Sequence, residues 1–250
     1  MICMKRYQTV PLSFRPGLRL FRWFMPSLPH AQPLVSIPRV GDFALGDWEE
    51  TTRVMKHGAR FWLRQSWFSK PSPTFRPGYV RLGVNGGDLV AHAVLRDDQP
   101  HNRAVEWNDR TWITGDVLEL FFQAEGWAGY HEFHVTPENQ RLQLVFPYHD
   151  AFRQKRPWGF WTVKESCFES AASINAARTH WQAVMRIPLA TVFGGAGEGP
   201  GVKGSRKFRF TFSRYDYQAG QELPVTSATA PLTSSDFHNT YEWSWVEAAL

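Results

Sequence analysis

The sequence predicts an all-β fold, an antiparallel β-sandwich or jelly roll in a single domain with little helix. Short segments of alternating apolar and polar residues recur along the chain, and glycine-, proline- and asparagine-rich turns separate them. Aromatic residues, which favour strands, make up 15% of the 250 residues, and 12 of them are tryptophans. The two cysteines, Cys3 and Cys167, are too few for a disulfide framework or a cysteine-based metal site.

The first half of the domain is expected to contain a ring-rich strand and a hairpin. The fold should start near Ile37, with a turn at residues 46–48 that returns an aromatic ring to the core. Residues 58–68 are dense in aromatic rings and predict a strand. Residues 79–95 predict a hairpin, because apolar residues alternate on both sides of the turn-forming sequence Asn-Gly-Gly-Asp at residues 85–88.

A β-meander of three strands is predicted across residues 112–146. The first strand is expected over residues 117–122, and the second over residues 130–136 after a turn-rich gap. A proline and an asparagine at residues 137–139 then end the pairing, and a third strand follows to residue 146.

The predicted meander places polar side chains on its strands. Leu118, Leu120 and Phe122 are expected to face the core, which puts Glu119 on the other face of the first strand. Glu132 and His134 share one face of the second strand. Trp112 lies just before the first strand.

The second half of the domain predicts further strands. Strands are expected at residues 180–187, 207–217 and 241–246, with one helical turn over residues 188–193. The glycine-rich residues 194–204 predict a loose loop that lacks the sequence context of a phosphate-binding loop.

Three connecting segments carry rings or charges. Residues 99–111 are polar enough for a binding loop or a calcium site, although their spacing is not that of an EF-hand, and a solvated connection is the alternative. Residues 147–157 form a basic and aromatic loop, and residues 159–163 predict a short strand.

Residues 1–35 predict a basic, proline-containing leader rather than a folded segment. The first forty residues hold six arginines and lysines and no acid, and without them the chain has 22 basic and 23 acidic residues. The folded part therefore lacks the positive charge expected of a nucleic-acid-binding protein.

The chain contains no run of eighteen apolar residues, so no membrane-spanning helix is predicted. Residues 18–29 are partly apolar after a basic start, but arginines and a proline interrupt them. The leader therefore has three interpretations: a degenerate export signal, a disordered extension, or a start codon assigned too far upstream. Export would place the protein in the periplasm or outside the cell, and its absence would leave it in the cytoplasm. The sequence does not predict an oligomeric state.

The polar row beside aromatic residues indicates carbohydrate binding. Sugar hydroxyls need paired donors and acceptors, and the C–H face of a sugar packs on an aromatic ring. The structural alternative is that Trp112 is a lid on the core and that Glu119 is solvated or ion-paired.

The order of several motifs resembles that of the family 9 carbohydrate-binding modules and the wider DOMON-like sandwich group, over most of residues 40–246. The motifs are Trp112 before a D-x-x-E strand (Asp116 and Glu119), a Gly-Tyr strand with a Pro/Asn turn (Gly129 to Asn139), an Ile-Pro pair (Ile187 and Pro188), an F-x-R-x-D strand (Phe212, Arg214 and Asp216) and a terminal aromatic loop (Asp236 to His238).

This resemblance implies a non-catalytic sandwich that binds sugar ends or short saccharides on one sheet face, often with structural calcium, beside enzymes that degrade polysaccharides. Carried over, Trp112 and Phe237 would be the two walls of an aromatic clamp, and Glu119 would accept hydrogen bonds from sugar hydroxyls. Arg214 and His134 are further candidate polar contacts, and Trp107 is a further candidate ring.

The sequence departs from the family pattern at two of these positions. Where sugar-binding members have an arginine in the second strand, this chain has His134, which only partly replaces a forked donor. The second wall, typically a tryptophan, would be Phe237 or Tyr241.

Two other functions stay open at this stage. Glu119 and Glu132 could flank a scissile glycosidic bond as the two carboxyls of a glycoside hydrolase, unless Arg209 or Arg214 pairs with them. A haem- or metal-binding DOMON-like domain would draw its ligands from His131, His134 and His238, although His131 and His134 should point to opposite strand faces.

Overall fold

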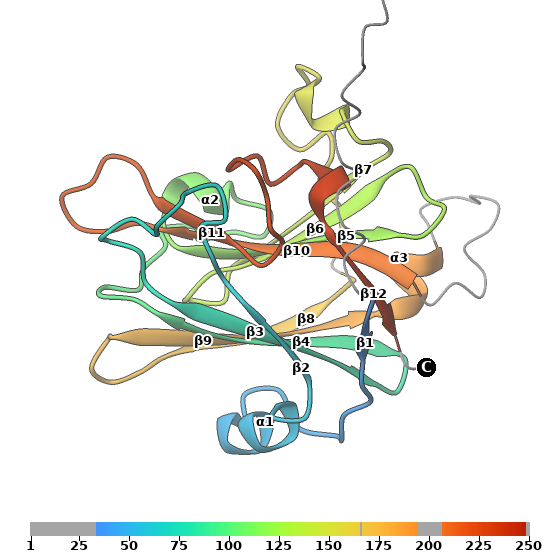
Figure 1. The fold of residues 1–250 in the computed structure, drawn as a ribbon, viewed down its shortest axis with the longest axis horizontal. Coiled ribbons are helices and arrows are strands. Elements are labelled where there is room, and N and C mark those ends of the chain that lie inside the picture. Colours follow the sequence, from blue (N-terminus) through green and yellow to red (C-terminus); the bar gives the residue numbers. More distant parts are fainter. Residues whose placement is uncertain (1–33, 166, 195–206, 249–250) are drawn as a thin grey trace, which may run out of the picture. The chain divides into compact units, whose positions relative to one another are not determined.

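The computed structural model describes residues 34–165, 167–194 and 207–248, which form two stacked β-sheets (Figure 1). Within these residues one sheet has seven strands in the order β1-β12-β10-β5-β6-β7, with β11 also paired to β10, and the other has five in the order β2-β3-β4-β9-β8. All pairs are antiparallel except β1 with β12. The predicted sandwich with little helix is confirmed.

The elements have the following bounds. The seven-stranded sheet contains β1 (Val35–Ile37), β5 (Val117–Ala124), β6 (Tyr130–Val135), β7 (Arg141–Phe146), β10 (Lys207–Asp216), β11 (Val225–Ala228) and β12 (Ser244–Ala248). The five-stranded sheet contains β2 (Ala59–Trp62), β3 (Gly78–Asn85), β4 (Asp88–Arg96), β8 (Glu169–Ile174) and β9 (His180–Pro188). The helices are α1 (Trp48–Met55), α2 (Thr111–Thr114) and α3 (Leu189–Gly194), with 3₁₀ turns η1 (Ala151–Arg153) and η2 (Thr240–Glu242).

The main core lies between the two sheets. Alternation sends Leu118, Leu120 and Phe122 of β5 inward, where they meet Phe210 and Phe212 of β10, and all five are essentially fully buried. Burying a phenylalanine or leucine side chain stabilises a fold by about 1.5–3 kcal/mol. The predicted inward face of β5 is therefore the one that holds the sandwich together.

The outer face of the seven-stranded sheet is buried as well. Phe121 of β5, Tyr130 of β6 and Phe146 of β7 form a second apolar cluster with Phe237 and Trp243 from the C-terminal segment. Figure 1 shows the segment after β7, which includes η1, on this side of the sheet, away from the five-stranded sheet. Covering segments thus turn a sheet face that would otherwise meet water into a second buried layer.

The predicted hairpin and the predicted strand-to-helix step agree with the structure. β3 and β4 pair around a turn in which Gly86 has φ 55°, a left-handed conformation that glycine adopts without steric cost. Likewise β9 runs directly into α3.

Several predicted elements differ from the structure. The turn expected at residues 46–48 is the start of α1, where the Asp47 side chain accepts a hydrogen bond from the Glu50 N–H at 3.0 Å. An acid at the N-cap followed three residues later by glutamate is a helix signal. Glycine and aspartate also favour turns, so residues 46–48 match both a turn and the start of a helix.

The remaining differences concern strand lengths. The strand expected over residues 58–68 ends at Trp62, and β12 starts at Ser244 because Tyr241 lies in η2. Residues 159–163 make only a bridge between Thr162 and Leu144. β8 and β11 were not predicted. They contain serine, threonine and alanine in place of large apolar residues.

Two predicted segments fall largely outside the described residues. Residues 1–33 of the predicted leader are not among the described residues. The last residue of the predicted leader, Val35, belongs to β1 and pairs with Val246 of β12. Residues 195–204 of the predicted glycine-rich loop also lie outside the described residues. Among the described helices, none is long and apolar enough to cross a membrane.

Gly115 is expected to be required for the position of α2. Its φ is 154°, and a Cβ atom there would lie 2.4 Å from the His101 carbonyl oxygen. Gly115→Ala should therefore lower the free energy of unfolding by about 1–3 kcal/mol, measured by urea denaturation. Gly87→Ala is the matched control, because nothing lies within 4 Å of its Cβ position. The control should change stability by less than about 1 kcal/mol, and equal effects of the two changes would contradict this role.

Candidate functional site

A pocket of about 270 Å³ opens on the outer face of the seven-stranded sheet. β5, β6 and β7 form its floor, and the segment after β7 and the α2 region form its walls. Its lining residues are Arg110, Trp112, Glu119, Phe121, Glu132, Leu144, Phe146, Phe152, Gln154, Arg156, Pro157, Trp158, Gly159, Phe160, Trp161, Tyr215 and His238. It combines carboxyl groups, aromatic rings and guanidinium groups in one hollow.

Strand alternation and register bring three ionisable side chains together at the floor. Glu119 points outward from β5 because its neighbours Leu118 and Leu120 point inward. Glu132 and His134 point outward from β6, and the register pairs Glu119 with His134. We call Glu119, Glu132 and His134 the polar floor.

Hydrogen bonds connect the polar floor. His134 Nε2 lies 2.6 Å from Glu132 Oε1 and 3.5 Å from Glu119 Oε1. The Ser213 hydroxyl donates to Glu119 Oε2 at 2.7 Å, and the Thr111 hydroxyl lies 2.7 Å from His134 Nδ1. Each member is therefore held by at least one short contact, and both carboxyl groups line the pocket.

Burial controls the protonation of the polar floor. Desolvation raises the pKa of Glu119 to about 7 and the pKa of Glu132 to about 8. It lowers the pKa of His134, against the opposing pull of the Glu119 carboxylate. Loss of hydration disfavours each charged form. At neutral pH the two carboxyl groups of the floor can therefore both donate hydrogen bonds, through a protonated oxygen, and accept them.

Aromatic rings form the wall above the floor. The rings of Trp112 and Trp158 are 5.5 Å apart, centre to centre, at 58°, and Trp112 also meets His134 edge-on at 5.9 Å. Trp158 is 42% exposed. The Arg110 guanidinium lies 4.8 Å from the centre of the Trp158 ring. The wall thus presents apolar ring surface and a cation to the pocket opening.

The structure brings some predicted site residues together. Trp112 and Glu119 line the pocket, and His134 lies against both. Phe237 is only 3% exposed and packs beneath Phe121 rather than lining the pocket. Tyr241 is 74% exposed and does not line it either.

Trp158 is the second ring beside Trp112. Trp158 lies between the predicted loop (residues 147–157) and the predicted short strand (residues 159–163), so neither prediction includes it. His238, the neighbour of Phe237, also lines the pocket. The aromatic and basic residues concentrated in the segment 152–161 are the sequence signal that could have identified Trp158 as a candidate binding residue.

Trp107 and Arg214 lie away from the pocket. Trp107 packs on Phe168 with ring centres 6.2 Å apart, beneath the Arg141 guanidinium. Arg214 shares the inward face of β10 with Phe210 and Phe212 and pairs in register with Leu118 of β5. Glu119 points to the opposite side of the sheet, so Arg214 and Glu119 do not meet.

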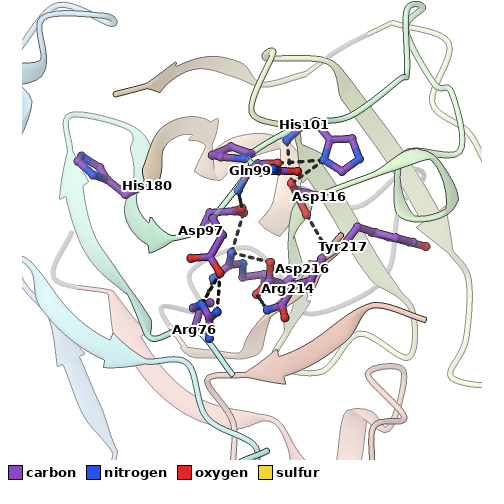
Figure 2. A network of polar contacts seen from close by, with 12 residues as sticks. Arg76, Asp97, Gln99, His101, Asp116, His180, Arg214, Asp216 and Tyr217 are labelled. Carbon is purple, nitrogen blue, oxygen red and sulfur yellow. Dashed lines mark hydrogen bonds and ion pairs between the residues drawn. The ribbon is translucent and has the colours of Figure 1, made fainter. Parts of the chain in front are cut away.

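Arg214 instead neutralises buried acids at the ends of β4 and β10 (Figure 2). Its Nη2 lies 2.9 Å from Asp97 Oδ2 and 3.3 Å from Asp216 Oδ1, and all three side chains are at most 3% exposed. Asp116 lies nearby and accepts hydrogen bonds from the N–H groups of His101 and Tyr217 at 2.8 and 2.7 Å.

This network does not fit the structural calcium that the resemblance implied. Asp97, Asp116 and Asp216 each have an oxygen within 4.8 Å of the others. The Arg214 guanidinium already supplies the positive charge at Asp97 and Asp216. Burial raises the pKa of Asp116 to about 8, with the Asp97 charge adding to the effect, so this acid is protonated in part at neutral pH.

The contacts also bear on the two other functions. His131 and His134 point to opposite faces of β6, as predicted: His131 lies against Trp127 and Phe133 on the inward face. Met185 is buried between the two sheets. Neither Arg209, which donates to Gln123, nor Arg214 pairs with Glu119 or Glu132. Those two carboxyl groups contact the same His134 nitrogen.

Comparisons with known proteins agree on the fold. A Bacteroides uniformis protein proposed to bind carbohydrate matches with a TM-score of 0.65 at 16% identity, over 86% of this chain and 98% of its own. A family 9 carbohydrate-binding module from Caldicellulosiruptor kristjanssonii matches in complex with cellotriose (TM-score 0.57, 11% identity, 86% and 92% covered) and with glucose (0.55, 10%, 85% and 95%). The sequence matches no family model and no curated protein. The chain therefore has the fold of the family 9 modules.

Replacement of Glu132 should change how stability depends on pH. The pKa of Glu132 is raised from 4.5 to about 8 by folding, so the folded protein binds more protons than the unfolded chain in that range, and its stability falls as pH rises. Glu132→Gln cannot lose a proton. Its unfolding free energy should fall less steeply between about pH 5 and 9, by about 1.4 kcal/mol per pKa unit of the shift, in urea titrations. Parallel curves for the two proteins would contradict the assignment.

Replacement of Arg214 should destabilise the fold strongly. Arg214→Met removes the guanidinium that contacts the buried Asp97 and Asp216 and should lower the free energy of unfolding by about 3–5 kcal/mol. Arg76→Met is the matched control, because Arg76 pairs with the exposed Asp98 and its loss should cost less than about 1 kcal/mol. Chemical denaturation measures both, and a small effect of Arg214→Met would argue against this role.

Proposed function

We propose that the protein binds carbohydrate without catalysis, and that sugar ends or short oligosaccharides enter the pocket between Trp112 and the polar floor. One observation carries this proposal: a hollow closed by two carboxyl groups stands beside a pair of tryptophan rings, the half-buried Trp112 and the exposed Trp158. Such binding would support the degradation of polysaccharides by partner enzymes.

The floor chemistry suits sugar hydroxyls. Each hydroxyl both donates and accepts, and a floor of one ionised and one protonated carboxyl group offers both functions. Because the pKa values of Glu119 and Glu132 lie near neutrality, the floor holds both forms at physiological pH. Their burial strengthens each hydrogen bond made there, since the local dielectric is low.

The walls suit the rest of a sugar ring. Apolar C–H groups pack on aromatic faces, which Trp112 and Trp158 supply. Arg110 and Arg156 lie at the opening over the rings of Trp158 and Phe160, where their free N–H groups can donate to outer hydroxyls. Neither guanidinium forms an ion pair with a carboxylate in the described part of the chain, and Arg156 donates to Gln154 through Nε, which leaves its terminal N–H groups for a ligand.

The size and closure of the pocket favour a chain end. Its volume of about 270 Å³ is near the lower limit of small-molecule sites, about 300–1,000 Å³. The floor blocks passage of a continuous polysaccharide. The fold shared with modules solved in complex with glucose and with cellotriose supports the same class of ligand.

Removal of either tryptophan ring should weaken sugar binding. Trp112→Ala and Trp158→Ala should each reduce the affinity for glucose, cello- or xylo-oligosaccharides by about tenfold or more, since a stacked ring contributes roughly 0.5–1.5 kcal/mol beyond its buried area. Isothermal titration calorimetry in the presence of EDTA measures the affinity of the full chain.

The matched control is Trp62→Ala. Trp62 is also 42% exposed, but it belongs to the five-stranded sheet and meets Tyr79 edge-on. Its removal should leave sugar affinity unchanged. Absence of binding to any of these sugars at millimolar concentration, with the protein folded, would refute the proposed function.

A further inference from the structure

We propose that the polar floor is also a binding site for one divalent transition-metal ion, held by Glu119, Glu132 and His134. Their ligand atoms all lie within 4.8 Å of one another, and all three residues are buried. Two of them line the open pocket, which provides a path for an ion. This inference does not depend on sugar binding.

An unpartnered oxygen points independently to a missing ligand. Glu132 Oε2 is buried and has no hydrogen-bond partner among the described residues. His238 Nδ1 lies 4.0 Å from it and already lies 2.7 Å from the Tyr130 hydroxyl. A buried carboxyl oxygen without a partner costs about 1–3 kcal/mol or more, and a cation at the floor would remove that cost.

The spacing of the floor fits a small ion. Two ligands of one tetrahedral ion lie about 3.4 Å apart when each is about 2.1 Å from it. His134 Nε2 and Glu119 Oε1 are 3.5 Å apart. The hydrogen bond of 2.6 Å between His134 Nε2 and Glu132 Oε1 would open by about 0.8 Å when the ion replaces its proton.

Two further contacts orient the ligands. Thr111 holds His134 through Nδ1, which turns Nε2 towards the carboxyl groups, and Ser213 holds Glu119 through Oε2, which leaves Oε1 for the ion. Metal-binding histidines and carboxylates commonly have such partners, and losing one typically reduces metal affinity about 10–100-fold.

Charge balance also fits a divalent ion. Two carboxylates and a neutral imidazole carry two negative charges, which one M²⁺ ion neutralises. The other titratable groups facing the floor are His238, whose Nδ1 lies 4.0 Å from Glu132 Oε2, and Tyr215 of the pocket lining. Arg110 and Arg156 are the charged groups of the pocket, and both lie over wall rings.

The ligand types select the class of ion. An imidazole nitrogen with two carboxylates suits Zn²⁺ or Mn²⁺, whereas Ca²⁺ takes oxygen ligands. Three protein ligands leave at least one coordination position of Zn²⁺ free. That position would face the pocket.

Binding of Zn²⁺ to the metal-stripped full chain tests the inference. Equilibrium dialysis with metal analysis should show one ion per chain that Glu132→Gln loses, with affinity reduced at least about 100-fold, and Thr111→Val should reduce it about 10–100-fold. Glu49→Gln removes an exposed acid of α1 and should leave this ion bound. Circular dichroism confirms that each variant is folded.

A second measurement needs no variant. Calorimetric titration of the metal-stripped wild-type chain with Zn²⁺ should show one site per chain, and Ca²⁺ at the same concentration should not displace the zinc, because Ca²⁺ takes oxygen ligands. Absence of zinc binding, equal binding by wild type and folded Glu132→Gln, or displacement of the zinc by Ca²⁺ at the same concentration would each overturn the inference. Sugar binding is measured in EDTA, so failure of the metal site and failure of the proposed function are distinguishable.

Discussion

The structure depends on burial of both faces of the seven-stranded sheet. The inward face of β5 carries Leu118, Leu120 and Phe122 into the main core, and the outward face is covered by the segments after β7 and before β12. An outward-facing acid such as Glu119 is consequently 2% exposed. In that environment a carboxyl group must find a cation, a proton or a ligand, and the chemistry of the pocket follows from this requirement.

Two clusters of buried acids meet this requirement in different ways. At the ends of β4 and β10, the Arg214 guanidinium lies between Asp97 and Asp216, so that cluster is internally neutralised. At the polar floor no guanidinium of the described residues contacts either carboxyl group, and Glu132 Oε2 has no hydrogen-bond partner among them. The first arrangement stabilises the fold. The second leaves hydrogen-bonding capacity that a bound molecule or ion can use.

The two proposals use the same floor in different ways. A saccharide would exchange hydrogen bonds with Glu119 and Glu132 while its apolar face packs on Trp112. An ion would instead take the place of the proton beside His134 and keep a free position towards the pocket. His134 is central to this difference, because an arginine at this position would supply a fixed cation, whereas a buried neutral imidazole offers a lone pair.

The sequence by itself determined the sandwich, the β3–β4 hairpin and the sidedness of β5 and β6, because a period of two assigns each side chain to a face from local order alone. It also identified Trp112, Glu119 and His134 as neighbours in a meander. Only the tertiary structure decided that Trp158 rather than Phe237 stands beside Trp112, and that Arg214 pairs with Asp97. It also decided that the outer face is buried. These contacts join segments far apart in the chain, and their partners depend on how loops cover a sheet, which no local periodicity encodes.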